Sequence, residues 1–146
     1  QAVSYIQRTR RPVADIRAFL RAHIRQLDSL DLVVGDQAAR ARIWAELARA
    51  VPGVYITSSV RQLIEISHAD AGKHSGVRYV TELLGLTPAQ TAAFGDGDND
   101  ADMLRYVGCG IAVENASPAC LAAADYVTAR HDRDGVARGI YDILRI

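Results

Sequence analysis

Residues 91–103 read TAAFGDGDNDADM. A short apolar run from Thr91 to Phe94 stops at Gly95, and four aspartates follow between positions 96 and 102. An apolar strand that ends in a glycine and carboxylates is typical of the carboxyl edge of a parallel α/β sheet, where ligands bind. So many carboxylates at one point are costly unless they are solvated or meet a cation. We therefore expect half of a magnesium–phosphate site here.

The aspartate cluster is less typical of a calcium loop or of a simple helix start. An EF-hand calcium loop starting at Asp96 would need glycine at its sixth position and glutamate at its twelfth, where the chain has Ala101 and Val107. A helix N-terminus enriched in acids accounts for the later aspartates but less well for Asp96 and Asp98. Magnesium is commonly held by one or two carboxylates with water and phosphate, which favours the magnesium hypothesis.

The composition is that of a globular chain that can form a core, since 49% of its residues are apolar and 23% are charged. The 17 basic and 17 acidic residues cancel, which argues against a broad surface for nucleic acid or anionic membrane. No apolar run approaches the roughly 18 residues that span a bilayer. Cys109 and Cys120 form no metal-binding pattern and fit buried thiols of a reducing compartment, so we expect a cytoplasmic protein.

The pattern before position 68 predicts a small α/β layer. Its expected elements are a strand or loop at 1–11, a helix from Pro12 to Leu27, a buried strand at 30–34, a helix capped by Asp36, and an antiparallel pair at 54–57 and 63–67. Phe19, Trp44 and the isoleucines are expected core residues. After a polar link at 68–72, strands at 91–94, 110–113 and 126–128 alternate with helices, which indicates a parallel sheet.

Several segments of the second section resemble one family. They are GKHSGVRYVTELLGL at 72–86, GDGDNDADML at 95–104, GCGIAVENA at 108–116, AADYVT at 123–128 and DGVARGI at 134–140. Together they are similar to the lysine helix, fourth motif and tail of haloacid dehalogenase-like (HAD) phosphatases of the Cof-type sugar-phosphatase branch. The resemblance implies an α/β fold, with part of an α/β cap domain at 1–71 and the carboxy-terminal half of a Rossmann-like HAD core at 72–146.

The resemblance also implies roles for four residues. Asp96 matches the family's magnesium-ligating aspartate, and Asp100 matches the second acid, which ligates the metal or orients its waters. Asn99 matches a residue that supports the phosphate or the metal shell, and Lys73 matches the lysine that neutralises the phosphoryl group. These roles agree with the chemistry, because phosphoryl transfer is catalysed mainly by positioning and charge stabilisation.

For other polar residues the sequence gives less support for a role in the site. Asn115, in a turn after a strand, supports the site or is an ordinary turn residue. Arg61 in the hairpin connection suits a second phosphate or carboxylate, and His74 adjoins the lysine, but residues in such positions are more often surface side chains. Asp98 and Asp102 have no fixed role in the resemblance, and Asp102 is expected to cap a helix.

One part of the family mechanism has no counterpart in the chain. The resemblance implies a nucleophilic aspartate in an Asp-x-Asp-x-Thr or Val pattern, which forms a covalent aspartyl phosphate. Asp96-Gly97-Asp98 has that spacing in the context of the fourth motif. Asp132-Arg133-Asp134, followed by Gly135 and Val136, has it at the tail segment. We therefore expect this chain to be the carboxy-terminal portion of such an enzyme, inactive alone. We also expect an exposed sheet edge at 91–94 that self-associates or pairs with the missing amino-terminal half.

The expected function is magnesium-dependent hydrolysis of small phosphorylated metabolites such as sugar phosphates. A phosphomutase of the same superfamily shares the metal and lysine motifs and remains an alternative. A non-catalytic metal- or metabolite-binding fragment or subunit is the second alternative.

Overall fold

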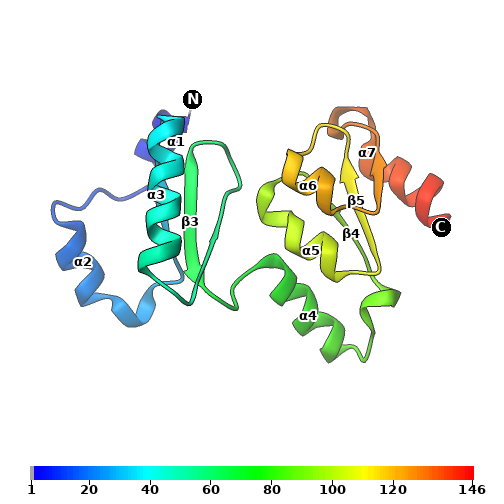
Figure 1. Cartoon of the computed structure of the whole chain (residues 1–146), viewed down its shortest axis with the longest axis horizontal. Helices are drawn as coiled ribbons and strands as arrows, with labels where there is room; N and C mark the ends of the chain where they lie inside the picture. The colour runs from blue at the N-terminus through cyan, green and yellow to red at the C-terminus, as the bar shows by residue number, and fades with distance from the viewer. Residues whose placement is uncertain (1) are drawn as a thin grey trace.

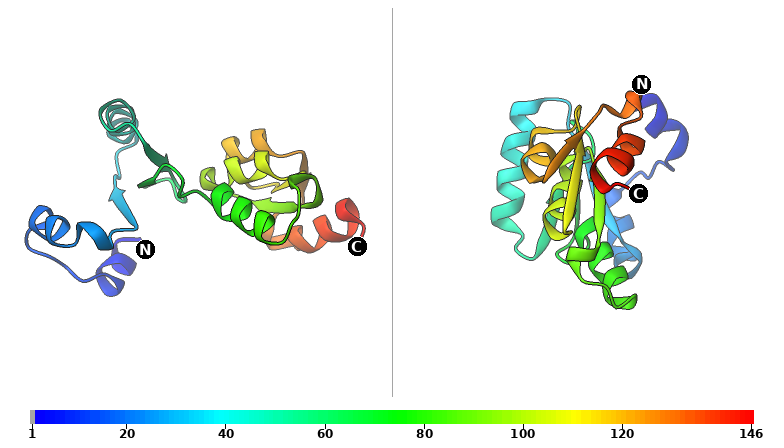
Figure 2. Two further views of the ribbon diagram at one scale, coloured as in Figure 1. Left: turned by 90° about the horizontal axis from the view of Figure 1, so that it is seen from below. Right: turned by 90° about the vertical axis from the view of Figure 1, so that its right-hand side faces the viewer.

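The computed structural model describes residues 2–146 and contains two β-sheets, each with its own helices, at opposite ends of the molecule (Figure 1). The first sheet is antiparallel, in the order β1 (Ser29–Val33), β3 (Leu63–His68), β2 (Val54–Thr57). The second is parallel, in the order β4 (Ala92–Gly95), β5 (Cys109–Val113), β6 (Tyr126–Thr128). The short segment 69–72 joins them, as the left view of Figure 2 shows. The α/β expectation is confirmed.

The helices of the first section precede and follow β1. They are α1 (Ala2–Thr9), α2 (Ile16–Ala22), a 3-10 turn (Ile24–Gln26) and α3 (Gln37–Ala50). Asp36 caps α3 as expected, since its Oδ1 accepts a hydrogen bond from the Ala39 N–H at 2.8 Å. The antiparallel pair is also confirmed, with Tyr55 opposite Ser67 and Thr57 opposite Glu65.

Three expectations for the first section are wrong. Residues 2–9 form a helix rather than a strand or loop, although most of them are weak helix formers, so intrinsic propensity does not account for this helix; Gln1 lies outside the described residues. Pro12 does not begin a helix, since α2 starts only after Asp15, whose side chain caps it. The strand β1 is mostly exposed, because it lies at the edge of its sheet.

The expected core of the first section is also only partly found. Ile64 is completely buried and Trp44 is half-buried. In contrast, Phe19 is 37% exposed and Ile24 is 69% exposed. An apolar periodicity shows which face of a helix avoids water, but it does not show that enough structure surrounds that face.

The second section is better packed. Its helices and turns are α4 (Lys73–Leu83), a turn at Pro88–Gln90, a turn at Asp98–Asp100, α5 (Ala101–Tyr106), α6 (Pro118–Ala123), a turn at His131–Arg133, α7 (Gly135–Arg138) and a π-helical turn (Gly139–Leu144). Leu104, Ile111 and Cys120 are at most 1% exposed. This core places the carboxyl end of β4 next to the start of α5, where the aspartate cluster lies.

The strand β4 has one paired edge and one edge without a strand partner among residues 2–146. The edge is not fully solvated, because Ala93 and Gly95 are buried. No helix among the described residues is both long and apolar enough to cross a membrane.

Candidate active site

The aspartate cluster is shaped by the close approach of β4 and the turn that follows it. A Cβ atom at Gly95 would lie 2.7 Å from the Asp100 Cβ and 3.2 Å from the Cys120 Sγ. Only glycine therefore lets Asp100 pack directly under the end of the strand. As a result, the Asp100 side chain is buried although it carries a carboxylate.

The buried Asp100 carboxylate is satisfied by three donors. Its Oδ2 accepts from the backbone N–H groups of Asp96, at 2.9 Å, and Gly97, at 3.0 Å. Its Oδ1 accepts from the Lys73 ammonium, which forms an ion pair with it. Burial raises the pKa of Asp100, but the hydrogen bonds from Lys73 and the two amides outweigh it, so the pKa lies below its ordinary value. Asp100 therefore fixes both the loop and the lysine.

Lys73 and Asp100 differ in their access to solvent. The Lys73 side chain, at the first position of α4, is 50% exposed, whereas that of Asp100 is 3% exposed. The ammonium can therefore contact a ligand while it remains paired. A cation at the start of a helix is unfavourable for the helix dipole, and the ion pair with Asp100 offsets this cost.

Asp96 has a different environment. Its side chain is exposed, and no hydrogen bond or ion pair to it is found within residues 2–146. Its backbone carbonyl accepts from the Ser117 N–H at 2.8 Å, which joins the loop to the start of α6. The carboxylate is thus held in place by its backbone but is free to bind a ligand.

A cavity of about 430 Å³ brings the predicted catalytic and metal residues together. Lys73, Asp96 and Asp100 all contribute to its wall. The remaining lining residues are Phe94, Gly95, Met103, Val113, His131 and Val136. Residues separated by more than twenty positions in the sequence therefore converge at the carboxyl end of β4.

A second cavity, of about 410 Å³, connects Asp96 to the first section of the chain. Arg61 and Asn115 both line it, together with Asp96 and Asp98. The Asn115 Oδ1 accepts from the His131 N–H at 3.0 Å, so Asn115 also holds the 130–131 loop. The structure thus places Arg61, Asn115 and Asp96 around one cavity, whereas the sequence did not show that these three residues lie close together.

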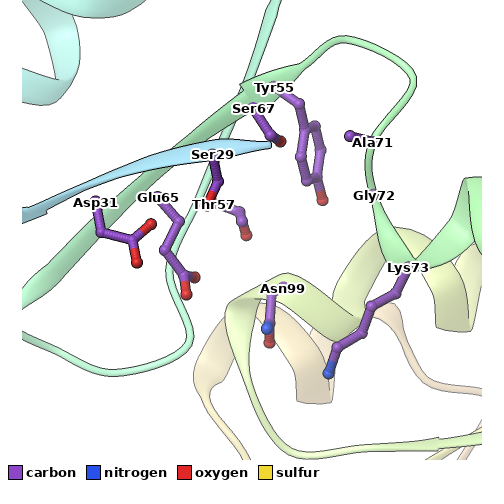
Figure 3. Close-up of a pocket in the computed structure, with 10 residues that line it drawn as sticks. All are labelled: Ser29, Asp31, Tyr55, Thr57, Glu65, Ser67, Ala71, Gly72, Lys73 and Asn99. Carbon is purple, nitrogen blue, oxygen red and sulfur yellow. The ribbon is translucent and has the colours of Figure 1, made fainter. Parts of the chain in front are cut away.

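A third cavity, of about 220 Å³, lies between the antiparallel sheet and the second section (Figure 3). Lys73 and Asn99 line it from the second section. Lys73 also lines the 430 Å³ cavity, so one side chain contributes to both spaces.

His74 lines none of these three cavities. Its ring packs against that of Tyr55, with the centroids 5.7 Å apart. A Cβ at Gly72 would lie 2.4 Å from the His74 Nδ1, so glycine is required for this packing. The structure therefore places His74 next to the connection between the two sections, in contact with Tyr55 of the first sheet.

Asp102 makes a contact that no local pattern in the sequence indicates. Its Oδ2 accepts from the Tyr55 hydroxyl at 2.9 Å, and its Oδ1 accepts from Arg105 at 2.9 Å. Burial, and then the hydrogen bond to Asp102, raise the pKa of Tyr55. The two residues are 47 positions apart, so only the three-dimensional structure shows that they join the two sections.

The residues at this site partly fit a divalent metal. Among residues 2–146 no group of three His, Cys, Asp or Glu side chains lies close enough to hold a metal ion. The Asp96 and Asp100 carboxylates line one cavity, and magnesium is often held by one or two carboxylates with water and phosphate. The oxygen donors are therefore of the right kind, and a phosphate and waters would complete the set.

Comparison with known proteins defines the class of protein. The model of the haloacid dehalogenase-like hydrolase family matches residues 3–140, and the chain belongs to this family. The chain is 35% identical over 105 residues to a Haemophilus influenzae protein named as a phosphatase. This match covers 72% of this chain and 40% of that protein. It is 39% identical over 80 residues to Bacillus subtilis YxeH, also named as a phosphatase, covering 55% of this chain and 30% of the other.

Solved structures agree with this assignment. The structure of the HAD subclass IIB sugar phosphatase BT4131 superposes with a TM-score of 0.76 and 26% identity, over 88% of this chain and 47% of that one. This match fits the Cof-type branch, and the family expected from the sequence is confirmed. The chain spans less than half the length of each of these three relatives.

Proposed function

We propose that these residues form part of a magnesium-dependent phosphatase of small phosphorylated metabolites, such as sugar phosphates, in the cytoplasm. The convergence of Lys73, Asp96 and Asp100 on one cavity carries the proposal. Membership of a hydrolase family and the phosphatase names of the relatives support it.

Each of these residues has a task that its environment suits. Lys73 neutralises the negative charge of the phosphoryl group, since half of its side chain is accessible. Asp96 and Asp100 would hold magnesium, and the bound ion would stabilise the charge on the phosphoryl oxygens. Asp100 also keeps Lys73 and the Asp96 amide in position. Asn99 and Asn115, each at the rim of a neighbouring cavity, support the phosphate and the surrounding loops.

The nucleophile belongs, in this proposal, to a segment outside residues 1–146, and this chain alone does not turn over substrate. The letters Asp-x-Asp-x-Val occur at positions 132–136, but neither aspartate of that segment lines the 430 Å³ cavity, and Asp132 is paired with Arg130. The free edge of β4 provides hydrogen-bonding groups that such a segment, or a second copy, would pair with. The first sheet then serves as part of a cap over the site.

The test compares two purified proteins: residues 1–146 and the longer protein encoded by the same reading frame. With p-nitrophenyl phosphate and magnesium, we expect turnover only by the longer protein. Asp96→Asn should lower that rate at least about 100-fold through loss of charge stabilisation, whereas Asp70→Asn, on the exposed connection, should not change it. An unchanged rate in Asp96→Asn, or equal turnover by the short chain, would contradict the proposal.

A further inference from the structure

One face of the antiparallel sheet is unusually polar. Side chains at alternate positions of its three strands line the 220 Å³ cavity: Ser29, Asp31, Tyr55, Thr57, Glu65 and Ser67. Strand register places Asp31 directly opposite Glu65, and Glu65 opposite Thr57. The face toward the second section therefore consists of hydroxyls and two neighbouring carboxylates.

The other face of the same sheet is apolar, which makes this polarity specific to the cavity. Ile64 is 0% exposed, and it alternates along β3 with Glu65. Since successive residues of a strand point to opposite faces, Ile64 packs away from the cavity. Antiparallel sheets commonly have one apolar and one solvated polar face, so this polarity alone does not identify a site; what matters is how the two carboxylates are paired.

The two carboxylates are incompletely compensated. Glu65 Oε1 accepts from the Ser59 hydroxyl at 2.8 Å, but its Oε2 is buried and has no hydrogen-bond partner among the described residues. No ion pair to Asp31 or Glu65 is found in the described part of the chain. Like charges directly opposite each other on a sheet are destabilising, and so is a buried acceptor without a donor.

We propose that this face binds the part of the substrate that leaves with the phosphate oxygen, and that it selects a group carrying hydroxyl or ammonium donors over one carrying a second anion. The inference rests on the proposed function for the position of the phosphate, at Lys73. Lys73 lines both the 430 Å³ cavity and this one, so a molecule whose phosphate lies beside Lys73 can extend toward the face that carries Asp31 and Glu65. Figure 3 shows both carboxylates on the side of the sheet that faces Asn99 and Lys73.

The charge of the cavity determines the preference. The Lys73 ammonium is already paired with Asp100, so it does not compensate the two cap carboxylates. Hydroxyl or ammonium groups supply the missing donor to Glu65 and reduce the repulsion between Glu65 and Asp31. A carboxylate or second phosphate in the same place adds a further negative charge, which raises the free energy of binding.

The test is a titration of uniformly 15N-labelled residues 1–146 at pH 7 with two ligands that share a six-carbon chain and one phosphate. Glucosamine 6-phosphate carries an ammonium, and 6-phosphogluconate carries a carboxylate. The dissociation constants are read from the amide shifts of Tyr55, Ser67 and Asn99, which lie around the cavity. We expect glucosamine 6-phosphate to bind at least about tenfold more tightly, a ratio equal to about 1.4 kcal/mol.

The variant Asp31→Asn/Glu65→Gln keeps the shapes of both side chains and removes both charges. In this variant we expect the two ligands to bind within about threefold of each other. Glu46→Gln, at an exposed position of α3 and not among the cavity residues, is the matched control and should keep the native ratio.

Equal affinities in the native chain, a preference for 6-phosphogluconate, no binding of either ligand, or an unchanged ratio in the double variant would each overturn the inference. The readout is a dissociation constant and not a rate. Failure of the proposed phosphatase function is therefore observed separately, as absence of turnover in the longer protein.

Discussion

The two sheets of this molecule contrast in packing and in the residues that they present to the space between them. Almost all the buried apolar side chains of the described residues lie around the parallel sheet, with Ile64 the exception. Large apolar side chains are exposed in both sections, for example Val33 in the first and Leu83 in the second, so the contrast lies in what each section buries. The antiparallel section presents hydroxyls and carboxylates toward the other section, whereas the parallel section presents a lysine, aspartates and an asparagine.

This difference separates two tasks. A group that stabilises developing charge must be held rigidly, because its contribution depends on preorganisation. The close-packed surroundings of Asp100 provide that rigidity. Recognition of a substrate tolerates a less tightly packed support, and it can change through single side chains on a strand. We therefore expect variants of the parallel section to affect stability and rate, and variants of the antiparallel section to affect binding.

The largest expected effect is on stability. Leu104→Ala in α5 removes a side chain that is 1% exposed, and we expect it to lower the free energy of unfolding by about 3 kcal/mol. Leu47→Ala makes the same change in helix α3, where the leucine is only half-buried, and should cost about 1 kcal/mol. Urea unfolding followed by circular dichroism measures both. Equal losses would show that the two sections are packed equally well.

The next effect is on rate, in the longer protein that we propose to be active. Lys73→Met removes the charge next to the phosphoryl group and should lower kcat about 100-fold. Arg61→Met, from the antiparallel section, changes a side chain that lines the cavity beside Asp96, and should raise KM by less than about tenfold with little change in kcat. Steady-state kinetics with p-nitrophenyl phosphate separates the two parameters. A fall in kcat for Arg61→Met as large as that for Lys73→Met would contradict the assignment of rate to the parallel section and of binding to the antiparallel section.

The contrast also determines what could be predicted from the sequence. The parallel sheet and α4 follow from local patterns, because strands that alternate with helices bring their carboxyl ends to one edge. That Lys73 acts with the aspartate cluster was implied only by the resemblance to the HAD family. The Asp36 cap was predictable for a similar reason, since it involves only residues three positions apart.

The arrangement of the antiparallel section could not be predicted in the same way. The position of β1 beside β3 depends on pairing between residues thirty or more positions apart. The hydrogen bond from Tyr55 to Asp102 depends on how the two sections meet. The exposure of Phe19 and Ile24 depends on how much structure covers them, which an apolar pattern does not report.

The hydrogen bond between the sections leads to a smaller prediction. Tyr55→Phe removes the donor to Asp102 and should weaken the association of the two sections by about 1 kcal/mol. The amide of Ala71, which donates to the His68 carbonyl at 2.9 Å in the connection, should then exchange its hydrogen faster. Tyr79→Phe, on an exposed face of α4, is the control. Unchanged exchange at Ala71 in Tyr55→Phe would show that this bond does not hold the sections together.

The smallest effects are expected at the two cysteines, which both lie in the parallel section. Burial, followed by the nearby charges of Asp100, Asp96 and Asp98, raises the pKa of Cys120 to about 11. Because a raised pKa disfavours the reactive thiolate, only about one thiol in a thousand is ionised at pH 8. The side chain is also 0% exposed. Alkylation by iodoacetamide at pH 8 should therefore reach Cys120 only when this section opens.

Labelling of Cys120 consequently reports on the parallel section alone. Cys109 is partly exposed and its pKa is raised by burial and by Asp125, so it should react first but more slowly than a free thiol. Leu104→Ala should accelerate labelling of Cys120, because it lowers the free energy of opening around that residue. Leu47→Ala should leave the rate unchanged, since its effect is confined to the antiparallel section. If Leu47→Ala accelerated Cys120 labelling as much as Leu104→Ala does, the two sections would open as one unit, and their difference in burial would not be a difference in local stability.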